Sequence, residues 1–456
     1  MFNKILIANR GEIALRIIRT CKELGIKTVL VYSEADKDSL PVQMSDETIC
    51  IGPPSAENSY LNIPRILSAA EITGCDAIHP GYGFLAENPD FAEQCEACNL
   101  RFIGPKSSTI RLMADKMLAR KKMQSAGLKI VPGSQDAIES VKQARQVAHD
   151  IGYPIILKAC AGGGGKGMRI VRQERDLETN VRLAQAEAKA SFNDERIYIE
   201  KFFDNARHIE VQVLADAYGN VIHLFERECS IQRRHQKLIE ETPSPLLDET
   251  SRLQICEDAV KGASAINYEN AGTMEFLVVP NSTDSPNNFD YYFMEMNTRI
   301  QVEHPITEIL TGVDIVKQQI LIADKEKLDC SLVSLRNPNI YCLECRINAE
   351  DVSKDFQPVP GKITQLQLPA GLGVRVDSHI YLGYTVSPYY DSLLCKIIAW
   401  DISRLGAINR MERALKETVI AGIKTTIPFH LKILNHPEFR KGNLSTALAE
   451  KLMINE

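Results

Sequence analysis

The segment IILKACAGGGGKGMRIV, residues 155 to 171, joins two short apolar runs through a glycine loop. Five of the six residues from 162 to 167 are glycine, which leaves backbone N–H groups free and allows a charged ligand to approach closely. The loop lacks the glycine spacing and the Ser or Thr after Lys that define a Walker A motif. A flexible linker would rarely separate two strong strand signals. The segment therefore predicts a phosphate site, with Lys158 on the entering strand as a point charge.

The chain before this loop alternates between strand and helix patterns. Short apolar runs predict strands and amphipathic runs predict helices: strands at 4–8, 27–32, 77–79 and 101–103, and helices from Glu12 and near Pro64. This alternation favours a parallel sheet with helices on both faces. The turn at 8–12 has no G-x-G-x-x-G motif, so the interpretation as a nicotinamide dehydrogenase loses its main support.

From residue 107 onward the pattern is a mixture of α and β elements. We predict helices at 107–126, at 138–150, from 174, at 311–323 and a final one from 404, and strands at 155–159, 168–171, 197–200, 209–215, 221–226, 273–278 and 291–295. The part between about 131 and 203 is interpreted as a small mobile lid. PNSTDSPNNFD (280–290) has the composition of a hairpin loop.

The segment MEMNTRIQVE, residues 294 to 303, carries the strongest chemical signal. Read as extended chain, it places Glu295, Asn297, Arg299, Gln301 and Glu303 on one side, and Met294, Met296, Ile300 and Val302 on the other. A solvent-facing strand also alternates, but this face combines two carboxylates, two amides and a guanidinium. Glu275, inside the apolar run 273–277, would be costly to bury alone and would be stabilised beside Glu295 around a divalent cation. Mg²⁺ prefers one or two carboxylates plus phosphate oxygens, so the two segments predict a magnesium–nucleotide site.

A third polar cluster is QRRHQK, residues 232 to 237. Such a charge run can be a solvated face. Together with a phosphate loop and a metal pair, it favours anion-binding groups for a second, negatively charged substrate.

The composition describes a globular protein of 456 residues, with 53 Lys and Arg against 59 Asp and Glu and a net charge of −6. This surface does not favour nucleic acid or anionic lipid, and no apolar run approaches the ~18 residues that span a membrane. The N-terminal sequence is not typical of a signal peptide, so we expect a cytoplasmic protein. The twelve cysteines indicate reduced thiols. Two C-x-x-C pairs, Cys95/Cys98 and Cys342/Cys345, are interpreted as structural because neither has the setting of a metal site.

Motifs along the chain resemble those of one known protein family. IANRGEIA (7–14), HPGYGFLAEN (79–88), GPK (104–106), the glycine loop, RRHQK (233–237), EMNTRIQVEHP (295–305), ECRINAED (344–351) and PYYDSLL (388–394) resemble the motifs of biotin carboxylase. This is the ATP-grasp component of biotin-dependent carboxylases. The departures are small: Ala161 and Lys166 replace the residues common in the family loop, and the loop at 281–290 is longer than usual.

The resemblance implies a fold and a set of site residues. The fold is α/β and α+β: an N-terminal Rossmann-like domain (1–113), an ATP-grasp domain (114–330) and a β-rich C-terminal biotin carboxylase domain (331–456). ATP would be held by Lys116, Lys158, Gly164, Gly165, Met168, Glu200, Lys201, Phe202, Phe203, His208, Gln232 and His235. Magnesium, or manganese, would be held by Glu275, Glu295 and Asn297. Bicarbonate would be held by Lys237, Arg299, Gln301 and Val302 with Glu303 as general base, and biotin would lie beside Arg346 and Tyr82.

The implied activity is ATP- and bicarbonate-dependent carboxylation of biotin through carboxyphosphate. The sequence has no Ala-Met-Lys-Met-like turn; MADKM (113–117) has Asp before its Lys, so biotin is expected on a separate biotin carboxyl carrier protein. The resemblance also implies a carboxyltransferase partner and a homodimer. Acetyl-CoA carboxylase and fatty acid biosynthesis are the favoured context, with pyruvate or another acyl-CoA carboxylase left open. Another ATP-grasp ligase and a non-enzymatic nucleotide-binding protein are the rival functions.

Overall fold

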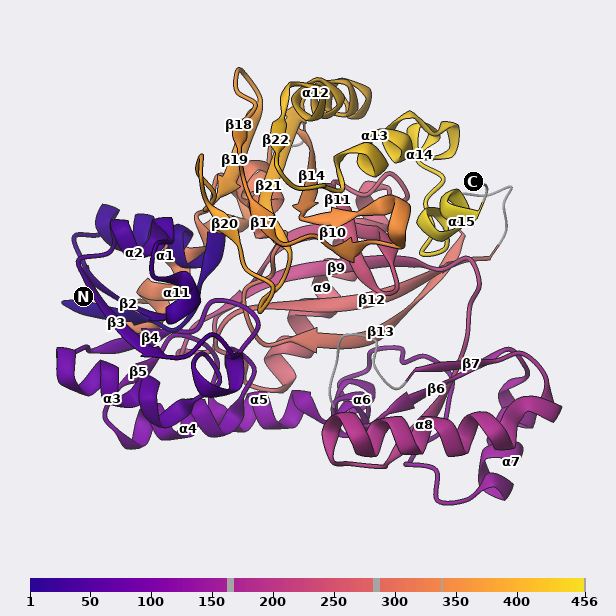
Figure 1. The fold of residues 1–456 in the computed structure, drawn as a ribbon. Coiled ribbons are helices and arrows are strands. Elements are labelled where there is room, and N and C mark those ends of the chain that lie inside the picture. Colours follow the sequence, from indigo (N-terminus) through magenta and orange to yellow (C-terminus); the bar gives the residue numbers. More distant parts are fainter. Residues whose placement is uncertain (162–167, 282–287, 338, 455–456) are drawn as a thin grey trace.

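The computed structural model describes residues 1–161, 168–281, 288–337 and 339–454 (Figure 1). Its N-terminal part is the predicted parallel sheet, with strand order β3-β2-β1-β4-β5. The strands are β1 (Lys4–Ile7), β2 (Lys27–Ser33), β3 (Glu47–Gly52), β4 (Ala77–His79) and β5 (Arg101–Phe102). The helices are α1 (Gly11–Glu23), α2 (Leu40–Met44), α3 (Ile63–Thr73) and α4 (Pro89–Ala97).

The two faces of this sheet are both covered. Successive residues of β1 point to opposite sides, so that Ile5 and Ile7 join the core beneath α1 while Leu6 joins the core that contains Ile66 and Phe91. Burial on both faces explains why these strands are continuous apolar runs rather than alternating ones.

The predicted helix at 107–126 is instead two helices, α5 (Ser107–Ala114) and α6 (Lys116–Ser125). Asp115 has an extended backbone between them, and its carboxylate accepts hydrogen bonds from the backbone N–H groups of Met117 and Leu118. An acidic N-cap of this kind starts a new helix at the next residue. Lys116 is therefore the first residue of α6 and lies beside the cavity described below.

Residues 131–203 include a small unit that stands apart at the lower right of Figure 1. Its antiparallel sheet has the order β7-β6-β8, with its own apolar core beneath two helices. The elements are β6 (Ile155–Ala159), β7 (Arg169–Val171), β8 (Ile197–Lys201), α7 (Val141–Ile151) and α8 (Leu177–Phe192). The strands agree with the prediction. Both helices start three residues later than predicted: Ser140 caps α7, and a 3₁₀ turn at Glu174–Asp176 precedes α8.

The centre of the molecule is an eight-stranded antiparallel sheet with the order β13-β12-β9-β10-β11-β14-β21-β19. Its strands are β9 (Arg207–Ala215), β10 (Val221–Arg233), β11 (Gln236–Thr242), β12 (Asn270–Pro280), β13 (Phe289–Asn297), β14 (Tyr341–Asn348), β19 (Val374–Ser378) and β21 (Leu393–Asp401). The four strands predicted between 209 and 295 are present, whereas β11 was not predicted. The sheet runs without a break from β13 at one edge to the C-terminal strands β14, β21 and β19.

Three helices around this sheet correct the sequence prediction. The predicted helix at 311–323 is α11 (Ile315–Ala323), preceded by an unpredicted α10 (His304–Thr311). Gly312, with φ of 70°, ends α10, and Asp314 caps α11. The helix α9 (Glu249–Ala265) was also missed, because its buried face includes small residues such as Gly262 and Ala263 that give a weak apolar period.

Short strands and α-helices make up most of the rest of the described C-terminal part. They are β15 (Glu350–Asp351), β16 (Gln357–Pro358), β17 (Gly361–Lys362), β18 (Gln365–Gln367), β20 (Thr385–Val386), β22 (Val419–Ala421), α12 (Arg404–Glu417), α13 (Ile427–Asn435), α14 (Pro437–Lys441) and α15 (Leu448–Ile454). The helix predicted from residue 404 is therefore not the final one. Pro428 and Pro437 stand in the first turns of α13 and α14, where proline is tolerated.

The structure also bears on the predicted hairpin loop and on the second C-x-x-C pair. β12 and β13 pair antiparallel from Thr273↔Asn297 to Pro280↔Phe289, as expected for a hairpin, and residues 282–287 of its loop lie outside the described residues. Cys342 and Cys345 lie in β14 in different buried clusters. They cannot share one metal ion.

Candidate active site

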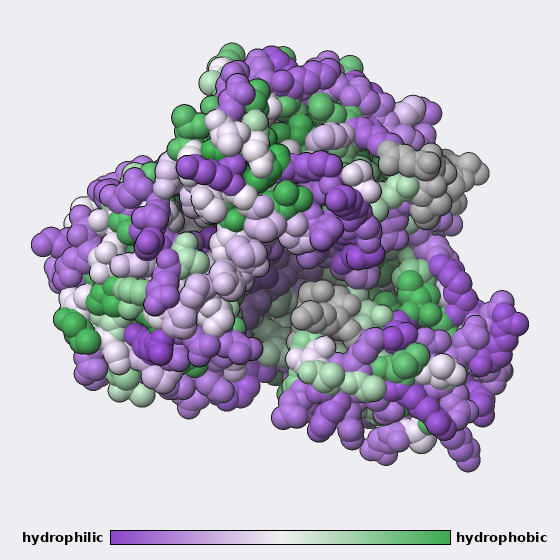
Figure 2. Space-filling model, viewed as in Figure 1, coloured by the Kyte–Doolittle hydropathy of each residue, from purple (hydrophilic) through white to green (hydrophobic). Residues whose placement is uncertain are grey.

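A cavity of about 930 Å³ lies between the small unit, the eight-stranded sheet, the N-terminal part and the segment before α15. Figure 2 shows the hollow between the lower-right unit and the parts above it. The predicted site residues that line the cavity are Tyr82, Lys116, Lys158, Met168, Glu200, Lys201, Phe202, Phe203, His208, Gln232, His235, Lys237, Glu275, Glu295, Asn297, Arg299, Gln301, Val302 and Arg346. Glu303 is fully buried just behind this wall. Gly164 and Gly165 lie outside the described residues.

Lys237, near the start of β11, is the centre of a buried charge cluster. Its Nζ atom lies 2.5 Å from Glu210 Oε2, 2.9 Å from Glu275 Oε1 and 2.7 Å from Glu303 Oε1. Burial alone would lower the pKa of Lys237, but the three carboxylates outweigh burial and raise it well above its usual range. Lys237 is therefore an ammonium ion at neutral pH.

Glu303 is held between two cations. Its Oε1 meets Lys237, and its Oε2 lies 2.9 Å from Arg346 Nη2. Burial would raise the pKa of Glu303, but Lys237, Arg346 and Arg227 together hold it well below its usual range. Glu303 is therefore ionised and able to accept a proton when one of these cations moves away.

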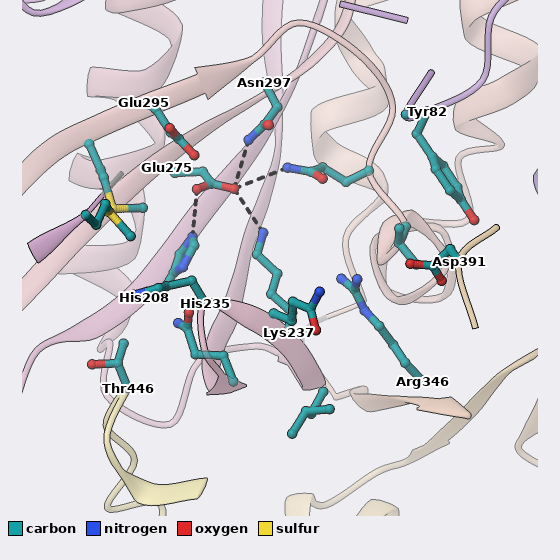
Figure 3. Close-up of a pocket in the computed structure, with 18 of the residues that line it drawn as sticks. Tyr82, His208, His235, Lys237, Glu275, Glu295, Asn297, Arg346, Asp391 and Thr446 are labelled. Carbon is teal, nitrogen blue, oxygen red and sulfur yellow. Dashed lines mark hydrogen bonds and ion pairs between the residues drawn. The ribbon is translucent and has the colours of Figure 1, made fainter. Parts of the chain in front are cut away.

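Glu275 and Glu295 lie directly opposite each other on β12 and β13, as the predicted metal pair requires. Figure 3 shows that Glu275 contacts side chains on several sides, among them Lys237, Asn297 and His208. Its Oε1 accepts hydrogen bonds from Lys237, Asn297 Nδ2 (2.9 Å) and Gln301 Nε2 (3.2 Å), and its Oε2 lies 3.1 Å from His208 Nε2. Burial would raise the pKa of Glu275, yet Lys237 and His208 hold it well below the usual value.

The predicted extended course of residues 294–303 holds only as far as Asn297, where β13 ends and the chain turns toward α10. Arg299 and Gln301 still face the cavity, where Arg299 pairs with Glu87 at 2.9 Å. The expected two-sided alternation is wrong for Met294 and Val302, which line the same cavity. Two irregularities bring both kinds of residue to one side: the pairing of β13 with β12 shifts register at Met294, and Val302 follows the turn after Asn297.

One end of the cavity combines cations with apolar walls. Glu200 is buried, with its Oε2 2.6 Å from Lys158 Nζ and with Arg120 as a second partner. Lys116 Nζ lies 2.9 Å from Glu295 Oε2. The apolar walls are Met168, Phe202 and Phe203. An aromatic base with a phosphate tail matches this combination of surfaces.

The other end contains Arg346 and Tyr82. Arg346 Nε lies 2.6 Å from Glu240 Oε1, and its Nη2 reaches Glu303, so the guanidinium is fixed from two sides. The hydroxyl of Tyr82 donates a hydrogen bond to Glu12. In Figure 3, Tyr82 and Asp391 lie on the opposite side of Arg346 from His208 and Thr446.

The turn between β10 and β11 places His235. Arg234 and His235 have φ angles of 46° and 63°, a left-handed conformation that is uncommon outside glycine. Asp355 holds the turn, pairing with Arg233 and, at 2.7 Å, with Arg234. Arg233 and Arg234 therefore stabilise the turn instead of lining the cavity, so only part of the predicted anion-binding run faces it. Burial, with Lys158 nearby, lowers the pKa of His235.

Sequence reasoning missed several residues of this site. They are Glu12, Glu87, Glu210, Arg227, Glu240 and Thr446. Glu210 could have been found, since it is an acid inside the apolar run HIEVQV, the same signal that singled out Glu275. Thr446 could not, because it lies far along the chain and nothing in its own sequence is distinctive.

The chain matches known protein families over three of its parts, and these matches identify the class of protein. Residues 115–331 match the family described as "Carbamoyl-phosphate synthase L chain, ATP binding domain". Residues 1–110 match "Biotin carboxylase, N-terminal domain", and residues 344–451 match "Biotin carboxylase C-terminal domain". The fold and the cavity are thus those of an ATP-grasp enzyme, an ATP-dependent ligase.

Individual relatives cover nearly the whole chain. The chain is 55% identical to "Biotin carboxylase 1" of Bacillus subtilis, over 99% of this chain and 98% of that protein. A crystal structure of the biotin carboxylase domain dimer of Hydrogenobacter thermophilus 2-oxoglutarate carboxylase, with MgADP, ADP and bicarbonate, matches with a TM-score of 0.94 and 48% identity over 99% of both chains. A crystal structure of the biotin carboxylase component of a pyruvate carboxylase matches with a TM-score of 0.83 and 46% identity, again over 99% of both chains. This chain belongs to the biotin carboxylase family.

The helices provide one further comparison with the sequence prediction. Among the described residues, no helix combines the length and the apolar composition needed to cross a membrane.

Proposed function

We propose that this chain carboxylates biotin on a separate carrier protein, using ATP and bicarbonate, as the first half-reaction of a biotin-dependent carboxylase. The observation that supports this most directly is the place of Glu303. Its carboxylate lies between Lys237 and Arg346, at the point where the cation-rich end of the cavity meets the end with Tyr82. A base at this position could accept a proton from bicarbonate on one side, with biotin bound on the other side.

ATP is assigned to the end with Lys116, Lys158 and Glu200. Adenine would lie along the edge formed by Glu200 to Phe203, with Met168 packed on the ring, and the ribose and phosphates would lie near His208, Gln232 and His235. All of these residues line the cavity. Gly164 and Gly165 are assigned to the phosphates from their sequence alone.

Magnesium is assigned to Glu275, Glu295 and Asn297. The fit is supported by the register, which sets the two carboxylates opposite each other with Asn297 beside them on the cavity wall. These are hard oxygen ligands, which suit Mg²⁺ and also Mn²⁺. When bound, the ion would neutralise charge on the phosphate oxygens.

The first step is a phosphoryl transfer. Lys237 and Arg299, with Gln301 and Val302, would hold bicarbonate against the γ-phosphate. Glu303 takes the bicarbonate proton as the bicarbonate oxygen attacks phosphorus, so that ADP leaves and carboxyphosphate forms. Lys237 must turn from Glu303 toward the anion, and losing this cation raises the pKa of Glu303 at the moment when a base is needed.

The second step transfers CO₂ to biotin. Carboxyphosphate breaks down to CO₂ and phosphate, the phosphate removes the N1 proton of biotin, and N1 attacks CO₂. Arg346 would stabilise the negative charge on the ureido oxygen, as an oxyanion-hole donor does. Tyr82 would lie beside the ureido ring. The unit between 131 and 203 would close over the site as a lid and exclude water.

Partners and context extend the proposal. We favour acetyl-CoA carboxylase and fatty acid biosynthesis. A pyruvate or another acyl-CoA carboxylase is the alternative, and the likeness to the biotin carboxylase component of a pyruvate carboxylase keeps it open. A biotin carboxyl carrier protein, a carboxyltransferase of the same complex, a homodimer and a cytoplasmic location belong to the same proposal. The proposed domains are 1–113, 114–330 and 331–456.

The test is phosphate release by the purified chain with ATP and magnesium, with and without bicarbonate and free biotin. We expect release to require bicarbonate and to be accompanied by acid-labile carboxylated biotin when biotin is present. ATP cleavage that ignores bicarbonate would instead favour another ATP-grasp ligase, and no cleavage at all would favour a nucleotide-binding protein. Capture of the endogenous biotinylated partner, and identification of its carboxyltransferase, would decide between acetyl-CoA and pyruvate carboxylase.

A further inference from the structure

Lys396 is a fully buried lysine that the proposed mechanism does not use. It lies in β21 between Cys395 and Ile397, neither of which is exposed to solvent. A buried ammonium ion is strongly destabilising unless it is paired and hydrogen bonded. Lys396 meets both conditions: its Nζ donates to the backbone carbonyl of Val302 at 2.8 Å and lies 3.1 Å from Glu12 Oε1.

Glu12 extends this contact to the other end of the cavity. Its side chain is only 2% exposed, and the same Oε1 atom that faces Lys396 accepts the hydrogen bond from the hydroxyl of Tyr82. Among the described residues, Glu12 Oε2 has no hydrogen-bond partner. One carboxylate oxygen therefore joins Tyr82 to Lys396.

The surrounding charges keep Lys396 ionised. Burial alone would lower its pKa, but Glu12, Glu344 and Asp377 outweigh burial and the repulsion from Arg375, so the pKa is raised. Lys396 therefore donates to the backbone carbonyl of Val302 as an ammonium ion.

We propose that the Glu12–Lys396 ion pair is a positioning device that joins the bicarbonate subsite to the biotin subsite. This inference rests on the proposed function, which places bicarbonate at Val302 and biotin at Tyr82. The peptide unit that follows Val302 is planar, so fixing its carbonyl also fixes the backbone N–H of Glu303, the proposed base. The same ion pair orients the hydroxyl of Tyr82. Residues from α1, from the loop after β4, from the turn before α10 and from β21 are thus locked together behind the cavity.

The test separates this role from a general contribution to stability. Lys396→Met keeps most of the side-chain volume and removes the charge, and Arg252→Met is the matched control. Arg252 is also buried, with its side chain 7% exposed and paired with the unexposed Glu226 at 2.8 Å, but it does not line the cavity. Both variants should lose stability, measured by urea unfolding.

Only Lys396→Met should change substrate binding. Without biotin, its KM for bicarbonate in ATP cleavage should rise about tenfold, near the lower limit expected for losing one hydrogen bond to a charged group. Its KM for ATP should stay within about twofold of the wild-type value, and both constants should be unchanged in Arg252→Met.

Tyr82→Phe tests the link if Lys396→Met does not fold, because it removes one hydroxyl beside an open cavity. We expect it to raise the KM for bicarbonate about twofold to threefold in the absence of biotin, and to raise the KM for biotin as well. An unchanged KM for bicarbonate in Tyr82→Phe, or in a folded Lys396→Met, overturns the inference while leaving the proposed function intact. If the wild-type chain shows no bicarbonate-dependent ATP cleavage, the proposed function fails instead.

Discussion

Replacing Arg346 by alanine should separate the two half-reactions of the proposed mechanism. The guanidinium is held by Glu240 at 2.6 Å and by Glu303 at 2.9 Å, on the side of the cavity away from the proposed nucleotide subsite. Removing one oxyanion donor typically lowers a rate by about 10² to 10³. We therefore expect carboxylation of free biotin to fall by that factor, while bicarbonate-dependent ATP cleavage without biotin stays within about tenfold of the wild-type rate.

The stability of the variant can be bounded from the same contacts. Breaking a buried ion pair from one side costs about 3–5 kcal/mol, because the partner charge is left uncompensated. Two features reduce this cost here. Glu303 keeps Lys237, and Glu240 can take up a proton, because burial and the nearby Glu303 raise its pKa to about 7. The variant should therefore fold, with a lower urea midpoint.

The assay is phosphate release with and without biotin, at saturating ATP and bicarbonate. Arg346→Lys is the matched control: it keeps the charge but cannot reach both carboxylates with a planar fork, so it should recover stability more than carboxylation. The ATP-cleavage profile of Arg346→Ala should also shift to higher pH, because Glu303 loses one of the cations that hold its pKa down. Wild-type carboxylation by Arg346→Ala would refute the assignment of this residue to biotin.

Three further predictions concern the carboxylates. Glu303→Gln should lose carboxylation and bicarbonate-dependent ATP cleavage together, by at least about 10², since general-base catalysis contributes that much; surviving ATP cleavage would move the base elsewhere, with His235 as the next candidate. Glu275→Gln and Glu295→Gln should each raise the magnesium concentration needed for half-maximal ATP cleavage while the fold is retained, and an unchanged magnesium dependence would exclude the metal assignment. Glu240→Gln should gain stability relative to the wild type as the pH rises. A carboxyl whose folded pKa is about 7 and whose unfolded pKa is near 4.5 destabilises the folded state increasingly between these two pH values, by at most about 3 kcal/mol above pH 7. Urea unfolding at pH 5 and pH 8 measures how much more stable Glu240→Gln is than the wild type at each pH. An equal gain in stability at both pH values would contradict the prediction.

Much of the fold could be predicted because local patterns agree with the tertiary structure. The strands of the parallel sheet are short apolar runs, and both faces of that sheet are buried, so tertiary packing reinforces the local signal. Prediction failed where one side chain overrides a long pattern. Asp115 divides an apparently continuous helix, and Gly312 and Asp314 move the start of another, because capping depends on geometry that residue periodicity does not express.

The site was predictable where an acid interrupts an apolar strand, as Glu275 does. It was not predictable where residues meet only through contacts distant in sequence. Lys396 and Glu12 are separated by most of the chain, and nothing near either residue indicates the other. The turn after β13 is a related case: the polar residues of 295–303 were identified from an extended conformation that ends at Asn297, and they meet because the chain turns.

The arrangement around Lys237 explains how one lysine can serve both the resting site and the proposed reaction. Each of the three carboxylates that contact Lys237 has a second nitrogen partner: the guanidinium of Arg227 at 2.6 Å for Glu210, the imidazole of His208 at 3.1 Å for Glu275, and the guanidinium of Arg346 at 2.9 Å for Glu303. Although burial lowers the pKa of His208, the nearby Glu275 outweighs burial and raises it. When Lys237 turns toward an anion, no carboxylate is left wholly unpaired, so the movement avoids most of the penalty for exposing a buried charge. The second partners are therefore what makes Lys237 free to move. Removing one of them would tie Lys237 to the carboxylate that lost its partner, and the affinity for bicarbonate would fall even where that partner touches no substrate.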